Sequence, residues 1–190
     1  SDQITHATPV AATIHGVRQV IFLTQTGLLA VAPTTGAQLW RQSFTFGTST
    51  GASPVVSDNY VYCSANYSVG AGVYRIDLNG TLWQSVQVWR KTDNALKNHW
   101  STPVCYNGYL YGLYGSGAYG TAPLQCVNLS TGNILWSQPN FGMGNVMRVG
   151  SKLIVLSDYG DIAIVEATPT AYTQIARAKM LSGKCWSTPV

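Results

Sequence analysis

Hydrophobic and polar residues follow short, strand-like patterns along the whole chain, and glycine, asparagine or aspartate separates one segment from the next. Segments such as Gln19–Thr24 (QVIFLT) and Gly27–Ala32 (GLLAVA) have the length and composition typical of β-strands. No stretch sustains the 3.6-residue apolar period of an amphipathic helix. Asn107-Gly108, between two such segments, is a strong signal for a two-residue hairpin turn. The pattern therefore predicts an all-β protein.

Two phrases recur at a nearly constant interval. Thr/Ser-Pro-Val occurs at residues 8–10, 53–55, 102–104 and 188–190. Its prolines lie 45, 49 and 86 residues apart, and the last interval equals two periods of 43. A missing copy should therefore fall near Val146. A period of about 40–50 residues built from short strands is typical of a β-propeller with one four-stranded blade per repeat.

The repeats predict four four-stranded blades, within residues 6–49, 50–98, 99–141 and 142–184. Residues 185–190 would begin a further repeat and add one extra C-terminal strand. The predicted strands are Pro9–Thr13, Gln19–Thr24, Gly27–Ala32, Gln38–Phe44, Pro54–Ser57, Tyr60–Ser64, Val73–Leu78, Thr81–Val88, Pro103–Tyr106, Tyr109–Leu113, Leu124–Leu129, Asn133–Ser137, a strand near Val146, Lys152–Ser157, Asp161–Glu166 and Tyr172–Ala178.

Turn glycines and tryptophans mark equivalent points of the repeats. Glycine adopts positive φ without steric cost, and a large ring three or four residues later can fill the wedge between neighbouring blades. The predicted structural repeat positions are Gly36, Trp40, Gly80, Trp83, Gly132 and Trp136.

The second phrase resembles a known repeat. A-x-x-x-x-T-G-x-x-x-W (Ala30 to Trp40) and T-G-x-x-x-W (Thr131 to Trp136) are similar to the repeat of the pyrroloquinoline-quinone-type (PQQ-like) propellers. Asp77 matches an acidic position of that repeat, whereas Ala32 and Asn128 depart from it. The family includes quinone-dependent dehydrogenases, the propeller lipoprotein of the outer-membrane β-barrel assembly machinery and exported bacterial proteins of unknown role. Rings of this family have seven or eight blades, so the resemblance implies a partial propeller or half of a dimeric ring.

Three insertions are predicted on one side of the propeller: Tyr67–Gly72, Trp89–Asn98 and Gly115–Pro123. Loops between blades and between second and third strands emerge on the same face, and loops on a rigid scaffold often carry function. The candidate ligand or partner rim at this face is His6, Lys97, His99, Trp100, Lys184 and Trp186. Such residues suit an acidic or sugar-like ligand or a peptide. The alternative is that they pack between blades.

Composition narrows the function. Charged residues make up only 9% of the chain, and the formal charge is +4 without a basic stripe, so we expect no nucleic-acid partner. No apolar run reaches the ~18–20 residues of a membrane helix. The four cysteines form no C-x-x-C pair, so we expect no metal site and buried free thiols rather than disulfides. The aspartates at predicted turns, such as Asp58, Asp158 and Asp161, need no catalytic explanation.

We therefore expect a non-catalytic, exported scaffold, periplasmic or at the cell surface, that presents its loop-rich face to a protein or a small polar ligand without a cofactor. One alternative is an enzyme, part of an alcohol or sugar dehydrogenase that uses PQQ and Ca²⁺. Another is a carbohydrate-binding propeller, because exposed tyrosines can stack on sugar rings. A homodimer could complete the ring.

Overall fold

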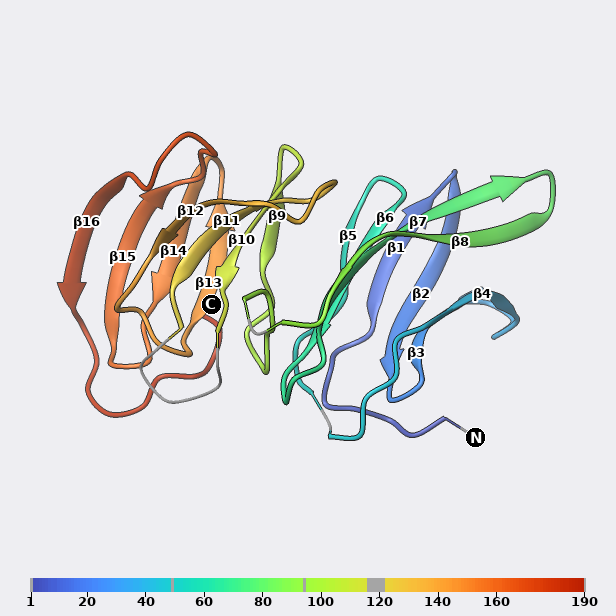
Figure 1. Cartoon of the computed structure of the whole chain (residues 1–190), viewed down its shortest axis with the longest axis horizontal. Coiled ribbons are helices and arrows are strands. Elements are labelled where there is room, and N and C mark those ends of the chain that lie inside the picture. Colours follow the sequence, from blue (N-terminus) through green and yellow to red (C-terminus); the bar gives the residue numbers. More distant parts are fainter. Residues whose placement is uncertain (1, 49, 94, 116–121, 190) are drawn as a thin grey trace.

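Four antiparallel sheets follow one another through the computed structural model, which describes residues 2–48, 50–93, 95–115 and 122–189 (Figure 1). Each sheet has four strands in chain order, and we call the sheets blades 1 to 4. The strands are β1 Val10–Ile14, β2 Val17–Thr24, β3 Gly27–Val31, β4 Gln38–Ser43, β5 Val55–Ser57, β6 Tyr60–Ala65, β7 Gly70–Asn79, β8 Leu82–Lys91, β9 Val104–Tyr106, β10 Tyr109–Leu113, β11 Leu124–Asn128, β12 Ile134–Gln138, β13 Asn145–Val149, β14 Lys152–Leu156, β15 Asp161–Glu166 and β16 Gln174–Lys179.

The predicted fold class is confirmed: the chain is all-β, with four propeller blades in an open arc. Within the described residues, no helix has the length and apolarity needed to span a membrane. The extra strand expected at 185–190 is not present in its described part, because residues 185–189 form no strand and are held to blade 4 by other contacts.

Two predicted insertions are partly strand. Residues 71–73 pair with residues 89–91 and lengthen the β7–β8 hairpin, so that only the β6–β7 turn at 66–69 and the connection after Lys91 are loops. The third insertion, Gly115–Pro123, lies mostly outside the described residues. In Figure 1 the β4–β5 and β6–β7 connections lie at the lower edge of the view and the β5–β6 turn at the upper edge.

Each blade buries one face against the next. Three apolar clusters fill the spaces between blades 1 and 2, blades 2 and 3, and blades 3 and 4. A β-bulge in the outermost strand of each blade, opposite the third strand, sets which residues reach these clusters. The residue after the bulge is Trp40 in blade 1 and Trp136 in blade 3, and both are buried. They face the following blade.

In blade 2 this position belongs to Trp89, not to Trp83 as predicted. Trp89 pairs with Val73 next to the bulge, and its indole Nε1–H donates to the Leu129 carbonyl of blade 3 at 2.8 Å. Trp83 lies on the opposite face of β8 and packs against the cluster between blades 1 and 2. Gly80 precedes Trp83 by three residues, whereas Gly36 precedes Trp40 by four. A one-residue difference in spacing moves a strand side chain to the other face of the sheet.

The Thr/Ser-Pro-Val phrase links successive blades. The Ser53 hydroxyl oxygen accepts a hydrogen bond from the Thr8 backbone N–H at 3.1 Å, and the Thr102 hydroxyl oxygen accepts one from the Ser53 N–H at 2.9 Å. Each hydroxyl thereby satisfies a backbone donor that lies just outside a strand, where the sheet offers no partner. The repeated hydroxyl is therefore part of the joint between blades.

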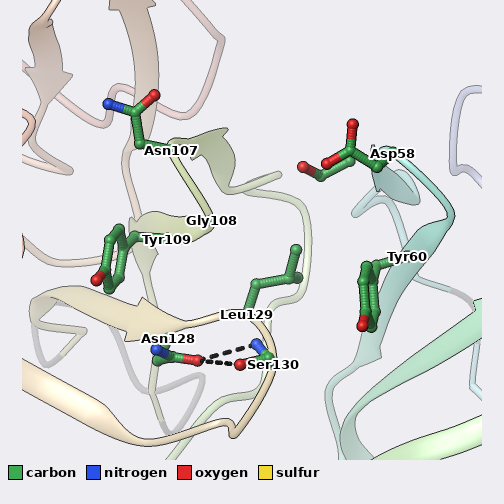
Figure 2. A pocket seen from close by; sticks show the side chains of 9 residues that line it. Asp58, Tyr60, Asn107, Gly108, Tyr109, Asn128, Leu129 and Ser130 are labelled. Carbon is green, nitrogen blue, oxygen red and sulfur yellow. Dashed lines mark hydrogen bonds between the residues drawn. The ribbon is translucent and has the colours of Figure 1, made fainter.

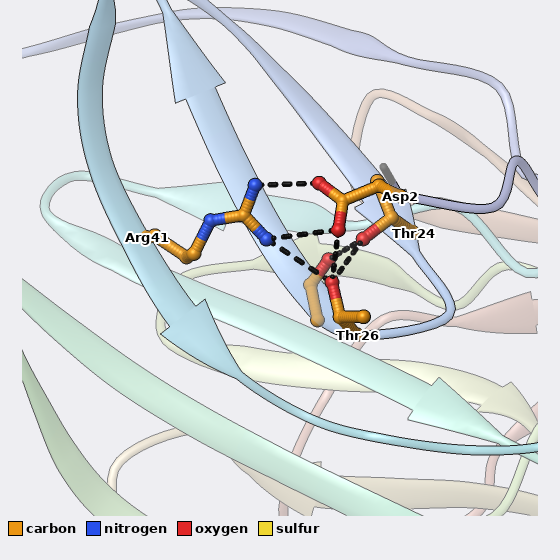
Figure 3. A network of polar contacts seen from close by, with 5 residues as sticks. Asp2, Thr24, Thr26 and Arg41 are labelled. Carbon is orange, nitrogen blue, oxygen red and sulfur yellow. Dashed lines mark hydrogen bonds and ion pairs between the residues drawn. The ribbon is translucent and has the colours of Figure 1, made fainter.

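The N-terminal segment is held to the outer strands of blade 1 by a polar network (Figure 3). The Arg41 guanidinium pairs with the Asp2 carboxylate at 2.5 Å, and the Thr26 hydroxyl donates to Asp2 at 2.6 Å and contacts the Thr24 hydroxyl at 3.1 Å. These contacts hold the pKa of the Asp2 carboxyl at about 2, chiefly through the hydrogen bonds from Arg41 and Thr26.

All four cysteines are free thiols. Cys63 and Cys126 are buried, as predicted for strand residues, whereas Cys105 and Cys185 are half-buried. Burial raises the pKa of the Cys126 thiol to about 11, because an apolar environment disfavours the thiolate. Cys63 and Cys126 belong to the apolar clusters between blades and serve as packing residues.

Candidate functional site

A row of aromatic rings crosses the face that carries the connections between blades. The Tyr67 ring lies 5.1 Å from the His99 ring, His99 lies 4.8 Å from Trp100, and Trp100 lies 4.6 Å from Trp186, measured between ring centroids. We call these four residues the aromatic row. Three separate segments supply it: the β6–β7 turn, the connection between blades 2 and 3, and the C-terminal segment. The fold thus joins three of the predicted rim residues and adds Tyr67.

His99 is fixed at the centre of the row by its backbone. The His99 carbonyl accepts hydrogen bonds from Gly51 N–H at 2.7 Å, Ala52 N–H at 2.9 Å and the Thr50 hydroxyl at 2.7 Å. Its Nε2 lies 3.2 Å from the Tyr67 hydroxyl, and its buried Nδ1 has no hydrogen-bond partner among the described residues. Burial lowers the pKa of the His99 imidazole, so His99 is neutral at pH 7.

The two tryptophans are anchored through their polar edges. The Trp100 Nε1–H donates to the Met143 carbonyl at 2.8 Å, and the Trp186 Nε1–H donates to the Asp158 carboxylate at 2.5 Å. Asp158 is itself buried. The amide of Asn145 donates to the Trp186 carbonyl. The C-terminal segment is thereby bound to blade 4 without forming a strand.

The remaining predicted rim residues differ in accessibility. The Lys184 ammonium lies 5.3 Å from the centroid of the Trp186 ring, a cation–π distance, on an exposed stretch. Lys97 is buried, which lowers the pKa of its ammonium. His6 is exposed, and its backbone N–H donates to the Thr50 carbonyl at 3.0 Å, so it lies near His99 without touching the row. Lys97 is therefore not a rim residue.

Sequence reasoning missed three residues that shape this face. Tyr67 sits at positive φ in the tight β6–β7 turn and is 57% exposed. Asp158, which we had attributed to a hairpin turn, holds Trp186. Asn98 is fully buried and ties the connection to both blades, accepting from the Tyr62 hydroxyl at 2.7 Å and donating to the Leu113 carbonyl at 2.9 Å. Only Asn98 had a sequence signal, as the polar neighbour of the predicted His99–Trp100 pair.

A Ca²⁺–quinone site, which the dehydrogenase alternative requires, would need clustered oxygen ligands. In proteins, Ca²⁺ is bound by roughly six to eight oxygen ligands. No group of three or more His, Cys, Asp or Glu side chains lies close enough to hold a metal ion in the described ranges. Three of the aspartates, Asp2, Asp77 and Asp161, instead form ion pairs with arginines.

The comparisons place these features in a family. The family model described as outer membrane protein assembly factor BamB matches residues 1–102, more than half of the chain. The chain belongs to this BamB family. No curated protein sequence matches it significantly.

Solved structures agree with this family's propeller fold. BamB from Moraxella catarrhalis superposes with a TM-score of 0.68 at 18% identity, covering 99% of this chain and 52% of that one. The computationally designed Ika8 protein gives 0.60 at 12% identity, covering 87% and 48%, and a europium-containing methanol dehydrogenase gives 0.61 at 12% identity, covering 90% and 41%. At these identities the likeness shows the fold alone. The chain spans about half the length of the BamB structure.

Proposed function

We propose that this BamB-family chain is a non-catalytic, exported scaffold that binds a protein partner through the aromatic row. The observation that carries the proposal is the aromatic row itself, in which two half-buried rings lie between two more exposed ones. His99 and Trp100 are half-buried, while Tyr67 and Trp186 are 57% and 36% exposed. Tyrosine and tryptophan held rigidly in this way supply contact area at low entropic cost, and they are enriched among residues that dominate binding energy.

The charge near the row indicates the kind of partner segment. Lys184 lies beside Trp186, and the chain carries a net charge of +4. A positive potential speeds association with an acidic segment and orients it. A partner segment with acidic and apolar side chains therefore suits this face. Membership in a family described as outer membrane protein assembly factor BamB supports a location in the periplasm and a protein partner from that process.

A photo-crosslinking experiment tests this function. A benzoylphenylalanine replaces Tyr67 in the protein as it is produced in its own cells, and the same substitution at Leu82 serves as control. Leu82 is 71% exposed at the start of β8, beside the β7–β8 turn on the opposite face. We expect one dominant cross-linked protein from position 67, none from position 82, and loss of the product in a Trp186→Ala background. Equal products from both positions would contradict the proposal.

The open faces of blades 1 and 4 bear on the expected homodimer. In blade 4 the face away from blade 3 exposes Ile164 and Ala176. In blade 1 the face away from blade 2 leaves Phe22 and Leu29 half-buried. Interior blades bury the equivalent positions, so these two faces suit further propeller blades. That a second copy supplies them stays a prediction, which the solution mass by light scattering checks: a monomer contradicts it.

A further inference from the structure

A second candidate site lies on the face opposite the aromatic row. It is a pocket of about 270 Å³ between blades 2 and 3, shown in Figure 2. Asp58 lies on one side and Asn107 on the other, with Tyr60 and Tyr109 below them. Leu129 lies between the two tyrosines in this view. The volume is slightly below the ~300 Å³ lower range of pockets for drug-sized ligands, which suits one small ring.

Repetition builds this pocket. Asp58 and Asn107 occupy the turns between the first and second strands of neighbouring blades, at φ of 54° and 50°. Aspartate and asparagine are the residues, after glycine, that most readily adopt this left-handed conformation. Tyr60 and Tyr109 begin β6 and β10, so each blade contributes one turn residue and one ring. Because β5 contacts β9, the two turns lie side by side.

The floor of the pocket is rigid. The Leu129 backbone N–H donates to the Gly108 carbonyl at 3.0 Å, and its carbonyl accepts the Trp89 indole N–H at 2.8 Å. The Asn128 side-chain oxygen accepts from the Ser130 backbone N–H at 3.0 Å and is therefore occupied by its own turn. A ligand would meet fixed walls rather than a mobile loop.

The polar groups that line this pocket have unused hydrogen-bonding capacity. The side chains of Asp58 and Asn107 and the hydroxyls of Tyr60 and Tyr109 make no hydrogen bond or ion pair to another described residue. Together they offer an acceptor-only carboxylate, an amide with both donors and an acceptor, and two hydroxyls that do both. A set that mixes donors and acceptors matches ligand hydroxyls. A phosphate would require donors only and an ammonium acceptors only.

Asp58 is the charged side chain of the pocket lining, and an arginine lies in the neighbouring part of blade 4. Arg148 lies over the Tyr106 ring at 4.9 Å, and Arg148 and Asp58 both lie close enough to Cys105 to influence its thiol. Aromatic rings beside polar groups present an apolar surface to C–H faces and hydrogen bonds to the edge of a ligand.

We propose that this pocket binds one pyranose ring of a carbohydrate, packed against Tyr60 or Tyr109 and hydrogen-bonded to Asp58 and Asn107. The site is independent of the aromatic row and of any protein partner bound there. It differs from the sequence expectation, which placed ligand binding on the other face.

The experiment titrates the protein with the methyl glycosides of glucose, galactose, mannose and N-acetylglucosamine, and with a linear tetramer of each sugar. Saturation-transfer difference NMR detects binding, and ¹H–¹⁵N spectra locate it. We expect at least one glycoside to bind with a dissociation constant on the order of 1 mM, as for a ligand of this size. Tighter binding of a tetramer would identify a polysaccharide as the source.

Two variants and a control make the result specific. Asp58→Asn keeps a residue that tolerates the left-handed turn but removes the charged acceptor, and Tyr60→Ala removes one wall. Each should weaken binding about tenfold, the effect of losing one charge-assisted hydrogen bond or one ring contact. Ser151→Ala, in the corresponding turn of blade 4, should leave binding unchanged.

Three results would overturn the proposal. One is that no glycoside binds when its concentration is about 20-fold above the expected dissociation constant. Another is that binding persists unchanged in Asp58→Asn. The third is that Nα-acetyl-arginine amide binds at the pocket and the sugars do not. If Tyr60→Ala fails to fold, as judged by its melting curve, the variant Asn107→Asp is used in its place. Aspartate tolerates the same turn, and it replaces the amide NH₂ donor with a carboxylate oxygen that accepts hydrogen bonds.

Discussion

Alanine at Gly132 should destabilise the protein more than alanine at Gly36, although the two backbones are alike. Both glycines occupy the turn between the third and fourth strands of a blade, with φ of 69° and 70°. Around Gly36 an added Cβ would meet nothing within 4 Å. At Gly132 the same atom would lie 2.9 Å from Cδ2 and 3.0 Å from Cε2 of Trp89, on the neighbouring blade. The pair therefore separates backbone strain from crowding between blades.

The magnitude follows from these two terms. Left-handed φ costs an alanine about 1–2 kcal/mol, and the loss of unfolded-chain entropy returns about 0.4–1 kcal/mol, so Gly36→Ala should cost about 0–1.6 kcal/mol. Gly132→Ala carries the same terms and adds about 1–3 kcal/mol for overpacking. The Lys91 ammonium, which donates to the Gly132 carbonyl at 2.6 Å, keeps the turn from moving away from Trp89.

Urea unfolding of the two variants measures the difference through the midpoint and the slope m. A third variant, Trp89→Leu, removes the ring that the alanine at position 132 would crowd. In the double variant with Gly132→Ala, the free-energy cost of overpacking should therefore be smaller. The reasoning is refuted if the two alanine variants have the same stability within about 0.5 kcal/mol, the usual size of a surface substitution effect.

Two further predictions concern the tryptophans and the N-terminal network. Trp89→Phe should lower the free energy of unfolding by about 1–3 kcal/mol, because the buried Leu129 carbonyl loses its hydrogen-bond donor. Trp83→Phe should cost less, because Trp83 makes no such bond to another described residue. Urea titration compares the two variants, and equal losses of stability would contradict the assignment. Asp2 has a lowered pKa of about 2, so the stability from its pairing with Arg41 is complete above about pH 4 and disappears as the pH falls toward 2. The urea midpoints of the wild type and Asp2→Asn should therefore differ at pH 6 and converge near pH 2. A difference that persists near pH 2 would contradict the pairing.

The sequence predicted every blade because the signals for strands and turns are local. Apolar patterning, Asn107-Gly108 and the glycines at 36 and 132 depend only on residues a few positions apart. The strand near Val146 followed from the period even though its proline phrase is missing, and it is β13 in the structure. The length of the β7–β8 hairpin was underestimated because its added residues look like a loop: Arg90 and Lys91 are polar, and residues 70–72 are small.

Contacts between distant segments were decided by the tertiary structure alone. Nothing in the sequence shows that Trp186 stacks on Trp100, or that Tyr67 reaches His99, since these pairs lie 86 and 32 residues apart. The same holds for the turns at 58 and 107, which form one pocket only because blades stack.

By itself, then, the sequence determined the number of blades, their strands and the turns between them, because these follow from local backbone preferences and the period of two along a strand. The tertiary structure decided which tryptophan joins blades 2 and 3, since the bulge in β8 sets which face of the sheet each side chain takes. It also buried Lys97 and exposed Tyr67, because burial depends on which neighbouring blade covers a loop.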